Sequence, residues 1–504
     1  MKLSIVQQTW RSAVLSALLA GSVHAQSGNE QQLLQFASQG NTAAARELLT
    51  QSVDVNAAQS DGTTALHWAV YYDDADLVAQ LLRQGADVGV RNHYGATPLA
   101  QAAINGNAGI ITALLRAGAE VDERGADDQT ALMIVARGGD VAAATALLAA
   151  GADPNAVEKW RGQSALMWAS AQAHPPLLQL LLAAGANPNA QSLPNDWERQ
   201  VTAEPRMKLL PPGGMSALHY AAREGCAECA RVLLAGGAKI DQADPEGVTP
   251  LVLANLNAQW DTAKVLIDAG ANVDKWDIYG RSPLYAAVDY NTVPHGGRAD
   301  RLSKDLTTSL DIIALILDTG GNPNLQLKLF PPYRSLGADR GADGLLRTGT
   351  TALLRAARGG DVEATALLLA HGARVDLPNE DGITPLLAAS GYRASNVDTR
   401  GKFRTEEQAH AIATLLLDAG ADANASESAG QTALYGAATN GWDTVVQLLA
   451  ERGADLEHKD QAGRTPLDAA LGRAGRFGRG DGAEQRVATA ALLEKLLAEK
   501  HAAQ

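Results

Sequence analysis

The sequence predicts an all-α chain built from about twelve tandem helix-turn-helix units. The first observation is a phrase of the form Thr/Ser-Ala/Pro-Leu, which recurs at Thr64, Thr97, Thr130, Ser164, Ser216, Thr249, Ser282, Thr351, Thr384, Thr432 and Thr465. The basal spacing of its copies is 33 residues, which is the period of a small supersecondary unit. The second observation is a Gly-Ala pair 21 residues after the phrase in most copies. A stack of such units has no single active-site cleft by default, but it offers a long concave surface.

Each unit contains two helix-forming stretches. In the unit that begins at Thr351, apolar residues at helical spacing predict one helix before the Gly359-Gly360 break and a second helix after it. Gly372 lies at the end of the second helix, in a position that favours a left-handed residue. Asp381-Gly382 then suits a tight turn. The unit is therefore predicted to run turn, helix, turn, helix.

These motifs resemble the ankyrin repeat, whose pattern is T-P-L-H-x-A followed by a second helix ending in L-L-x-x-G-A-D-x-N. Residues 64–69 are T-A-L-H-W-A, and residues 415–424 are L-L-L-D-A-G-A-D-A-N. The resemblance covers nearly all of residues 31–497 and implies an ankyrin-repeat solenoid with inserted loops. It also implies that His67 and His219, in the His position of the motif, make structural hydrogen bonds between units.

The first 25 residues predict a secretory signal peptide. Lys2 and Arg11 flank a polar start, a short apolar run follows, and Ala25 stands at the cleavage position. A lone membrane anchor is the alternative, which the shortness of the apolar run disfavours. The signal is typical of a Gram-negative bacterium. We therefore expect a periplasmic or secreted protein, mature from about Gln26 and without an integral membrane span.

The repeat anchors predict the remaining boundaries. A degenerate N-terminal capping repeat occupies 26–63, and a C-terminal capping repeat with a tail occupies 465–504. Between them we expect ankyrin repeats at 64–190, 214–324 and 350–464, inserted fingers at 191–213 and 325–349, and further inserts at 290–307 and 391–406. Both fingers contain K-L-[L/F]-P-P, and paired prolines stiffen a segment. The fingers are either a paired functional feature or two tolerated surface insertions.

The further inserts, together with a third one after Leu471, are basic in an otherwise acidic chain. Their cations are Arg298, Arg301, Lys304, Arg393, Arg400, Lys402, Arg404, Arg473, Arg476 and Arg479. They form either solvated loops, which we favour, or a rim that docks an anionic partner or lipid head group.

Composition and motifs argue against several classes of function. The net charge of −14 disfavours nucleic acid, whose phosphates require a basic surface. No nucleophile elbow, phosphate loop or dinucleotide fingerprint is present, so we expect no enzyme activity and no cofactor. Cys226 and Cys229 are expected at the start of a second helix, where they are small core residues, a disulfide or a redox pair. No metal site is expected, because two cysteines need two more ligands to hold zinc.

Aromatic residues make up 4% of the chain, so their positions are informative. We expect Tyr94, Trp160, Trp276 and Tyr279 in finger-tip connections, and Trp168 and Tyr220 on first helices, where Trp68 also lies. Trp197, Phe330 and Tyr333 lie in the inserted fingers. Aromatic side chains anchor many protein interfaces, so these residues are candidate partner-binding residues. The alternative for the helix positions is packing between neighbouring units.

We therefore expect an exported, monomeric scaffold that binds a partner protein, not identified by the sequence, on its concave face. The site is expected between the units of Ser164 and Thr351, framed by the two fingers. Alternatively, the fingers fold back and plug this face. The alternative function is that of a periplasmic protein with a redox-active pair at Cys226 and Cys229, or with a catalytic site built from the inserts.

Overall fold

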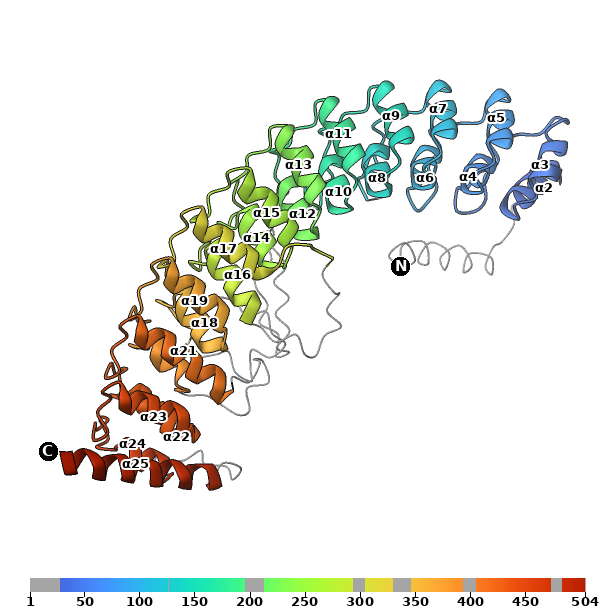
Figure 1. Ribbon diagram of the computed structural model, residues 1–504. Coiled ribbons are helices and arrows are strands. Elements are labelled where there is room, and N and C mark those ends of the chain that lie inside the picture. Colours follow the sequence, from blue (N-terminus) through green and yellow to red (C-terminus); the bar gives the residue numbers. More distant parts are fainter. Residues whose placement is uncertain are drawn as a thin grey trace. The chain divides into compact units, whose positions relative to one another are not determined.

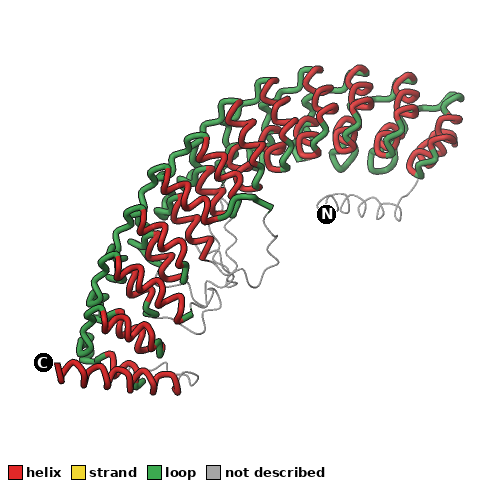
Figure 2. Tube along the Cα trace, in the orientation of Figure 1, coloured by secondary structure: helices red, strands yellow, loops and turns green. Residues whose placement is uncertain are grey.

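The computed structural model describes residues 28–125, 127–194, 213–292, 304–329, 346–392, 405–472 and 483–503. Within these ranges it contains 24 helices, α2 to α25, which follow one another as twelve pairs (Figures 1 and 2). Strand-like pairing in the same ranges is limited to isolated bridges, such as that between Ala58 and Thr64. The prediction of an all-α array of about twelve helix-turn-helix units is therefore confirmed.

The chain divides into two compact parts, Met1–Ser192 and Leu193–Gln504. From here on these parts are called unit 1 and unit 2, and each helix pair within them is called a repeat. The described part of unit 1 contains five helix pairs. They are α2 (Gly28–Ser38) with α3 (Thr42–Leu48), α4 (Ala65–Tyr71) with α5 (Ala75–Arg83), α6 (Pro98–Asn105) with α7 (Ala108–Arg116), α8 (Ala131–Gly138) with α9 (Val141–Ala149), and α10 (Ala165–Ala171) with α11 (Pro175–Ala183).

The described part of unit 2 contains seven pairs. They are α12 (Ala217–Glu224) with α13 (Ala227–Ala235), α14 (Pro250–Leu256) with α15 (Trp260–Asp268), α16 (Pro283–Thr292) with α17 (Ser309–Asp318), α18 (Ala352–Gly359) with α19 (Val362–Ala370), α20 (Pro385–Ala389) with α21 (Glu406–Asp418), α22 (Ala433–Asn440) with α23 (Asp443–Glu451), and α24 (Pro466–Ala470) with α25 (Ala483–Ala503).

The recurring Thr or Ser begins the first helix of a pair. Thr97 Oγ1 accepts a hydrogen bond from the backbone N–H of Ala100 at 3.2 Å, which satisfies one of the unpaired N–H groups at the helix start. Pro98 follows at the first helical position, where its missing N–H costs no hydrogen bond. Leu99 is buried and anchors the helix in the core. The repeated phrase therefore encodes the cap, the start and the core contact of the first helix.

The second helix of a pair begins at a polar cap and buries one apolar face. In α5, Asp74 Oδ1 accepts a hydrogen bond from the N–H of Leu77 at 2.9 Å. Leu77, Val78 and Leu81 recur at helical spacing and are fully buried. Gly85 follows with a φ of 84°, a left-handed conformation that glycine adopts without strain.

Within each unit the helices form two rows (Figure 1). In unit 1, first helices contact the next first helix, as α4 does α6, and second helices contact the next second helix, as α5 does α7. Unit 2 repeats this pattern, with α12 against α14 and α13 against α15. We call these the first-helix row and the second-helix row. Each repeat packs mainly on its neighbours, so the core is a continuous strip between the rows.

Two histidines join adjacent repeats, as the resemblance implied. The N–H of Thr64 donates to His67 Nδ1 at 3.2 Å, so Nε2 carries the proton and donates to the Ala96 carbonyl of the next repeat at 3.1 Å. His219 donates in the same way to the Val248 carbonyl at 3.0 Å. These histidines are structural links between repeats.

The last pair differs from the others, because α25 has 21 residues and packs on α22, α23 and α24. Thr489 and Leu493 lie on the buried side of α25, while Lys500 Nζ lies 3.0 Å from a carboxylate oxygen of Glu457. Through its length, α25 contacts both helices of the preceding pair as well as its own partner, α24.

Several predicted segments lie outside the described residues. They are the signal peptide (1–25), most of the fingers (195–212 and 330–345) and most of the other inserts (293–303, 393–404 and 473–482). In the part of the chain that the structure describes, no helix is both long and apolar enough to cross a bilayer.

Candidate functional site

The loops that precede the first helices are called fingers here, and the inserted segments 191–213 and 325–349 belong to two of them. Several described fingers are each held by one buried polar side chain. In unit 2, Asp277 Oδ1 accepts hydrogen bonds from the N–H groups of Tyr279 and Arg281, at 3.0 and 2.9 Å. Asn379 does the same for the N–H groups of Asp381 and Ile383, both at 3.0 Å. Equivalent pairs of bonds are made by Asn92, Asp244, Glu427 and Asp460. The finger tips are therefore fixed by local chemistry.

The charge on these buried side chains is balanced in some fingers and not in others. Arg281 donates to Asp277 Oδ2 through Nε and Nη2, at 2.7 and 2.6 Å, and both side chains are buried. Asp244 has the same two backbone donors, but a valine, Val248, occupies the position of the arginine. Burial raises the pKa of the Asp244 carboxyl to about 6.

Fingers of neighbouring repeats also bond to one another. In unit 2, the N–H of Ile278 donates to the Glu246 carbonyl at 2.8 Å, and the N–H of Lys328 donates to the Tyr279 carbonyl at 2.8 Å. Gly280 allows the second contact, because a Cβ there would lie 2.6 Å from the Lys328 backbone nitrogen. Three successive fingers thus form one hydrogen-bonded strip.

This strip carries an exposed apolar patch, which we call the finger-tip patch and define as Trp276, Ile278 and Leu329. Trp276 is 46% exposed and Leu329 is 52% exposed, and Ile278 is also exposed. Lys328 Nζ lies 5.9 Å from the centre of the Trp276 ring. Exposed large apolar side chains on a rigid backbone are well suited to bind another protein.

Unit 1 has two exposed aromatic finger tips of its own. Trp160 is 71% exposed, and Lys159 Nζ lies 5.1 Å from its ring centre. The backbone beneath it is fixed because Glu158 Oε2 accepts a hydrogen bond from the Trp160 N–H at 2.6 Å. Tyr94, also exposed, follows Asn92 at the equivalent place two repeats earlier. Both residues lie on finger tips, as the sequence predicts.

The other described candidates present less surface. Tyr220 and Tyr279 are each 6% exposed, and an arginine guanidinium lies 5.0 Å from each ring: Arg223 and Arg281, respectively. Tyr220 is therefore packed inside the array, which is the alternative given for the helix positions. Tyr279, expected on a finger tip, is packed there as well. Trp168 is partly exposed on α10. Trp197, Phe330 and Tyr333, together with the proline phrases, lie outside the described residues.

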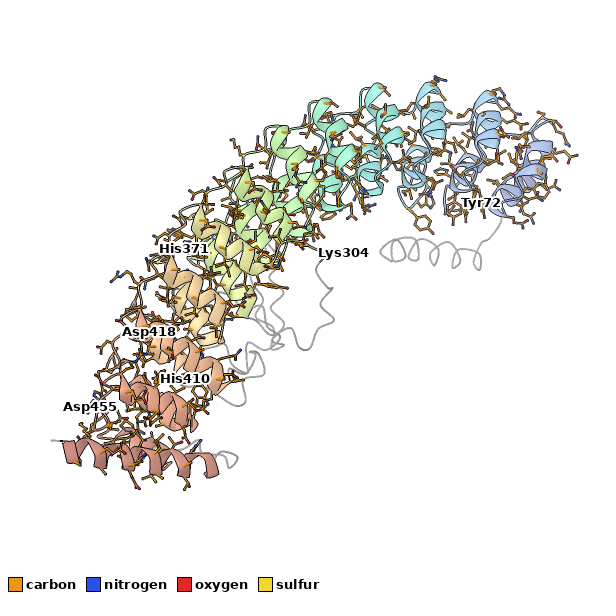
Figure 3. All side chains as sticks on the ribbon, in the orientation of Figure 1. Tyr72, Lys304, His371, His410, Asp418 and Asp455 are labelled. Carbon is orange, nitrogen blue, oxygen red and sulfur yellow. A yellow bond between two sulfur atoms is a disulfide. The ribbon has the colours of Figure 1, made fainter. Side chains whose placement is uncertain are left out.

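Sequence reasoning missed an aromatic cluster on α4. The ring centres of Trp68 and Tyr71 are 5.7 Å apart, and those of Tyr71 and Tyr72 are 5.1 Å apart. Tyr72, marked in Figure 3, is exposed and donates its hydroxyl to the Ser38 carbonyl at 2.9 Å. The signal was present in the sequence, because these residues stand four, seven and eight positions after Thr64, on one side of a helix.

Cys226 and Cys229 form a disulfide at the start of α13. Cys226 caps the helix, since its sulfur accepts the N–H of Cys229 at 3.1 Å. Cys229 is fully buried, whereas Cys226 is partly exposed. The bridge closes a very short loop, so it constrains the α12–α13 turn and little else.

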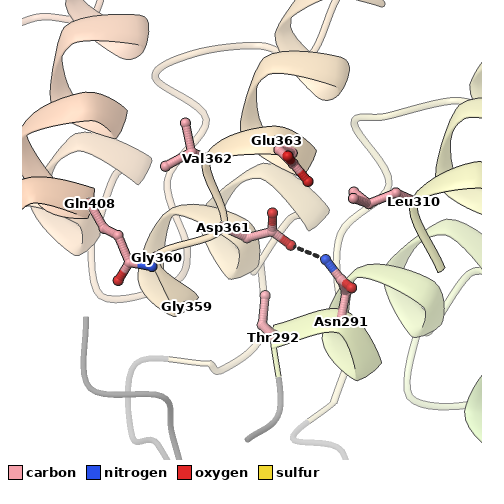
Figure 4. A pocket seen from close by; sticks show the side chains of 9 residues that line it. All are labelled: Asn291, Thr292, Leu310, Gly359, Gly360, Asp361, Val362, Glu363 and Gln408. Carbon is pink, nitrogen blue, oxygen red and sulfur yellow. Dashed lines mark hydrogen bonds between the residues drawn. The ribbon is translucent and has the colours of Figure 1, made fainter. Parts of the chain in front are cut away.

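A polar pocket of about 370 Å³ lies in unit 2 where α16, α17, α19 and α21 meet (Figure 4). Asn291 Nδ2 donates to Asp361 Oδ2 at 2.5 Å, and Asn291 Oδ1 accepts from the Ser309 hydroxyl at 2.5 Å. Asp361 Oδ1 caps α19 through the N–H of Ala364 at 3.0 Å. Because these groups already bond to one another, the pocket offers a ligand few unused partners. Across the described ranges, no three His, Cys, Asp or Glu side chains are placed to hold a metal ion.

Comparison with known proteins identifies the repeats. A family model described as ankyrin repeats (3 copies) matches residues 10–92, 33–125, 99–192, 218–296 and 405–477, and an ankyrin repeat model matches residues 348–380. Among solved structures, the human ASB11 ankyrin repeat domain is similar, with 23% sequence identity and a TM-score of 0.40 over 48% of this chain and 98% of that one. No curated protein matches the chain.

Proposed function

The chain belongs to the ankyrin repeat family, and from this premise we propose that it is a scaffold that binds a partner protein through its finger tips and first-helix row. Repeat arrays of this kind present extended surfaces to their partners. The proposal assigns no chemical reaction to the chain.

The observation that carries the proposal is the finger-tip patch of unit 2. Trp276, Ile278 and Leu329 are exposed, yet the backbone beneath them is fixed by Asp277 and by the finger-to-finger hydrogen bonds. A rigid backbone loses little conformational entropy on binding, so more of the contact energy appears as affinity. Tryptophan contributes strongly to protein interfaces.

Capture of the partner by variants of the purified chain tests this proposal. Trp276→Ala combined with Leu329→Ala should reduce stoichiometric retention of a native partner by at least about tenfold, since truncated interface anchors cost 1–2 kcal/mol or more. Lys264→Ala, in the second-helix row of the same unit, is the matched control and should retain the partner. Equal retention by the double variant and the parent, with both folded by circular dichroism, contradicts the proposal.

The proposal also includes export as a monomer to the periplasm or beyond the cell. It is supported by the charged start, short apolar run and small residues at the cleavage position within residues 1–25. Amino-terminal sequencing of the protein from its native source should begin at about Gln26. A first residue of Met1 contradicts export by this signal.

A redox function of the cysteine pair is the alternative, favoured by a bridge whose first cysteine is partly exposed at a helix start. The scaffold proposal expects the double variant Cys226→Ser/Cys229→Ser to bind its partner normally and to lose at most about 2 kcal/mol of unfolding free energy, because the closed loop is short. Loss of function in a folded double variant favours the redox alternative.

A further inference from the structure

Four of the five first helices of unit 1, those from α4 to α10, form a surface that is almost free of charge. The segments α4, α6, α8 and α10 contain one Lys, Arg, Asp or Glu residue between them, which is Arg137 on α8. The chain as a whole has 98 such residues, 42 basic and 56 acidic. Water-facing helix sides usually carry charged residues, so their depletion here marks a surface suited to desolvation.

Apolar and aromatic side chains occupy this surface at one repeat position after another. The residues four and seven positions after each recurring Thr or Ser are at least partly exposed: Trp68 and Tyr71, Gln101 and Ile104, Ile134 and Arg137, Trp168 and Ala171. We call this set the α4–α10 stripe. Ile104, at its middle, is 49% exposed, and Tyr72 extends the aromatic end. Adjacent helices of the stripe are in contact, so it is one continuous surface.

Toward α10, the stripe contains an arginine side chain that lies over a tryptophan ring. The Arg137 guanidinium lies 5.4 Å from the centre of the Trp168 ring, which joins α8 to α10. Among the residues that the structure describes, no carboxylate lies within ion-pairing distance of Arg137. By contrast, Arg46 and Arg91 of the same unit have acidic partners at 3.1 and 2.9 Å. The ring orients the guanidinium and leaves its charge to be matched by another molecule.

We propose that the α4–α10 stripe binds an apolar segment of a partner protein that places one acidic side chain against Arg137. The inference rests on the proposed scaffold function and names the kind of segment bound. Three interhelix steps of about 9 Å separate α4 from α10, a distance that about eight extended residues span. One acidic residue complements Arg137, whereas a strongly acidic segment would be repelled by a chain of net charge −14.

Selection from a random peptide library tests this proposal and does not require the partner to be identified first. Displayed peptides of about twelve residues are selected on the full chain, and the enriched peptides are measured by fluorescence anisotropy. The expected sequences combine aromatic or aliphatic residues with one Asp or Glu. Ile104→Ala and Arg137→Gln should each weaken them by at least about fivefold, as expected for an anchor and for a partly buried charge pair.

Two further variants separate a specific contact from general electrostatics. Arg116→Gln removes an exposed arginine from α7 of the second-helix row and should leave affinity unchanged. Arg137→Glu should abolish binding, and replacing the peptide's acidic residue with Lys should restore it. Such a charge swap requires direct pairing and is not produced by misfolding.

The inference is overturned if no peptide is enriched above a support without protein, if the enriched peptides lack an acidic residue, or if Arg137→Gln binds them as the parent does. If the Trp276→Ala variant alone weakens peptide binding, the α4–α10 stripe is not the binding site, but the scaffold function is retained. If every surface variant captures the native partner as well as the parent does, the scaffold function itself is contradicted. The two failures are therefore distinguishable.

Discussion

At the scale of single residues, the same position is occupied by different polar side chains in different repeats. The polar side chain that fixes a finger is aspartate at Asp244 and Asp277 but asparagine at Asn92 and Asn379, and all four accept the same pair of backbone hydrogen bonds. An amide oxygen is therefore sufficient for the structural role. Where a buried carboxylate has no cation beside it, its charge reduces stability.

Asp244→Asn should raise stability at neutral pH. Burial raises the folded-state pKa of Asp244 to about 6, above its usual 3.8, so the charged form destabilises the fold above pH 6 and protonation relieves this cost as the pH falls. At pH 7.5 the variant should gain up to about 3 kcal/mol of unfolding free energy, and the gain should vanish near pH 4. Urea unfolding followed by circular dichroism measures both values.

Asp277→Asn is the matched control for this prediction. Because the change leaves the buried guanidinium of Arg281 without its carboxylate, it should lower the unfolding free energy by about 3 kcal/mol. If Asp244→Asn destabilises the protein at pH 7.5, or if its effect does not change with pH, the electrostatic account of the fingers is wrong.

His219→Met should show the opposite dependence on pH. Burial lowers the pKa of His219 to about 4, so the neutral ring stabilises the fold above pH 6.5, and this contribution is lost as the pH falls toward 4. Methionine occupies the same position at Met133 and Met167. The variant should be less stable by about 1–2 kcal/mol at pH 7.5, through loss of the bond to Val248, and the gap should close or reverse by pH 4. A gap that widens in acid contradicts this assignment.

At the scale of elements, the finger strip depends on one glycine. Gly280 has a φ of 80°, and a Cβ there would meet the Lys328 backbone at 2.6 Å. Gly280→Ala should cost about 3 kcal/mol of unfolding free energy and should weaken partner binding, because the contact that supports Leu329 is displaced. Gly270→Ala is the control: its φ is 87° but its surroundings are open, so strain alone should cost about 1–2 kcal/mol. Equal losses for the two variants contradict the role of the contact.

The helices could be predicted from the sequence because their signals are local. A capping Thr, a first-turn proline and a left-handed glycine each specify one helix end, as at Thr97, Pro98 and Gly106. The exposure of aromatic residues could not be predicted in the same way. Tyr279 is buried and Trp276 is exposed, although both lie in one finger, because burial depends on Arg281 and on the next finger along the chain.

The site could be predicted in part. The finger-tip positions of Tyr94, Trp160 and Trp276 follow from their place before a recurring Thr or Ser. The aromatic cluster on α4 and the isolated charge of Arg137 could not be predicted from the sequence as features of a binding surface. Both depend on which helices are neighbours and on which carboxylates lie nearby. Side-chain contacts between repeats are set by packing, which the 33-residue period alone does not specify.

At the scale of the whole molecule, the chain is a set of similar repeats in which neighbouring pairs supply the core. Within each unit, α4 contacts α6 and α12 contacts α14, and each further pair repeats the arrangement. Such a design leaves the exposed positions of loops and first helices free to vary without loss of the fold. The exposed side chains to which we assign binding occupy such positions, in the finger-tip patch of unit 2 and the α4–α10 stripe of unit 1.

Site-specific photo-cross-linking tests the central claim, partner binding through finger tips and first helices, most directly. A photoreactive phenylalanine analogue replaces Trp276 in one sample and Lys264, in the second-helix row of unit 2, in another. Irradiation in the native compartment should yield one defined cross-linked product from position 276 and none from position 264. Equal products from the two positions, or a product from position 264 alone, would contradict the account.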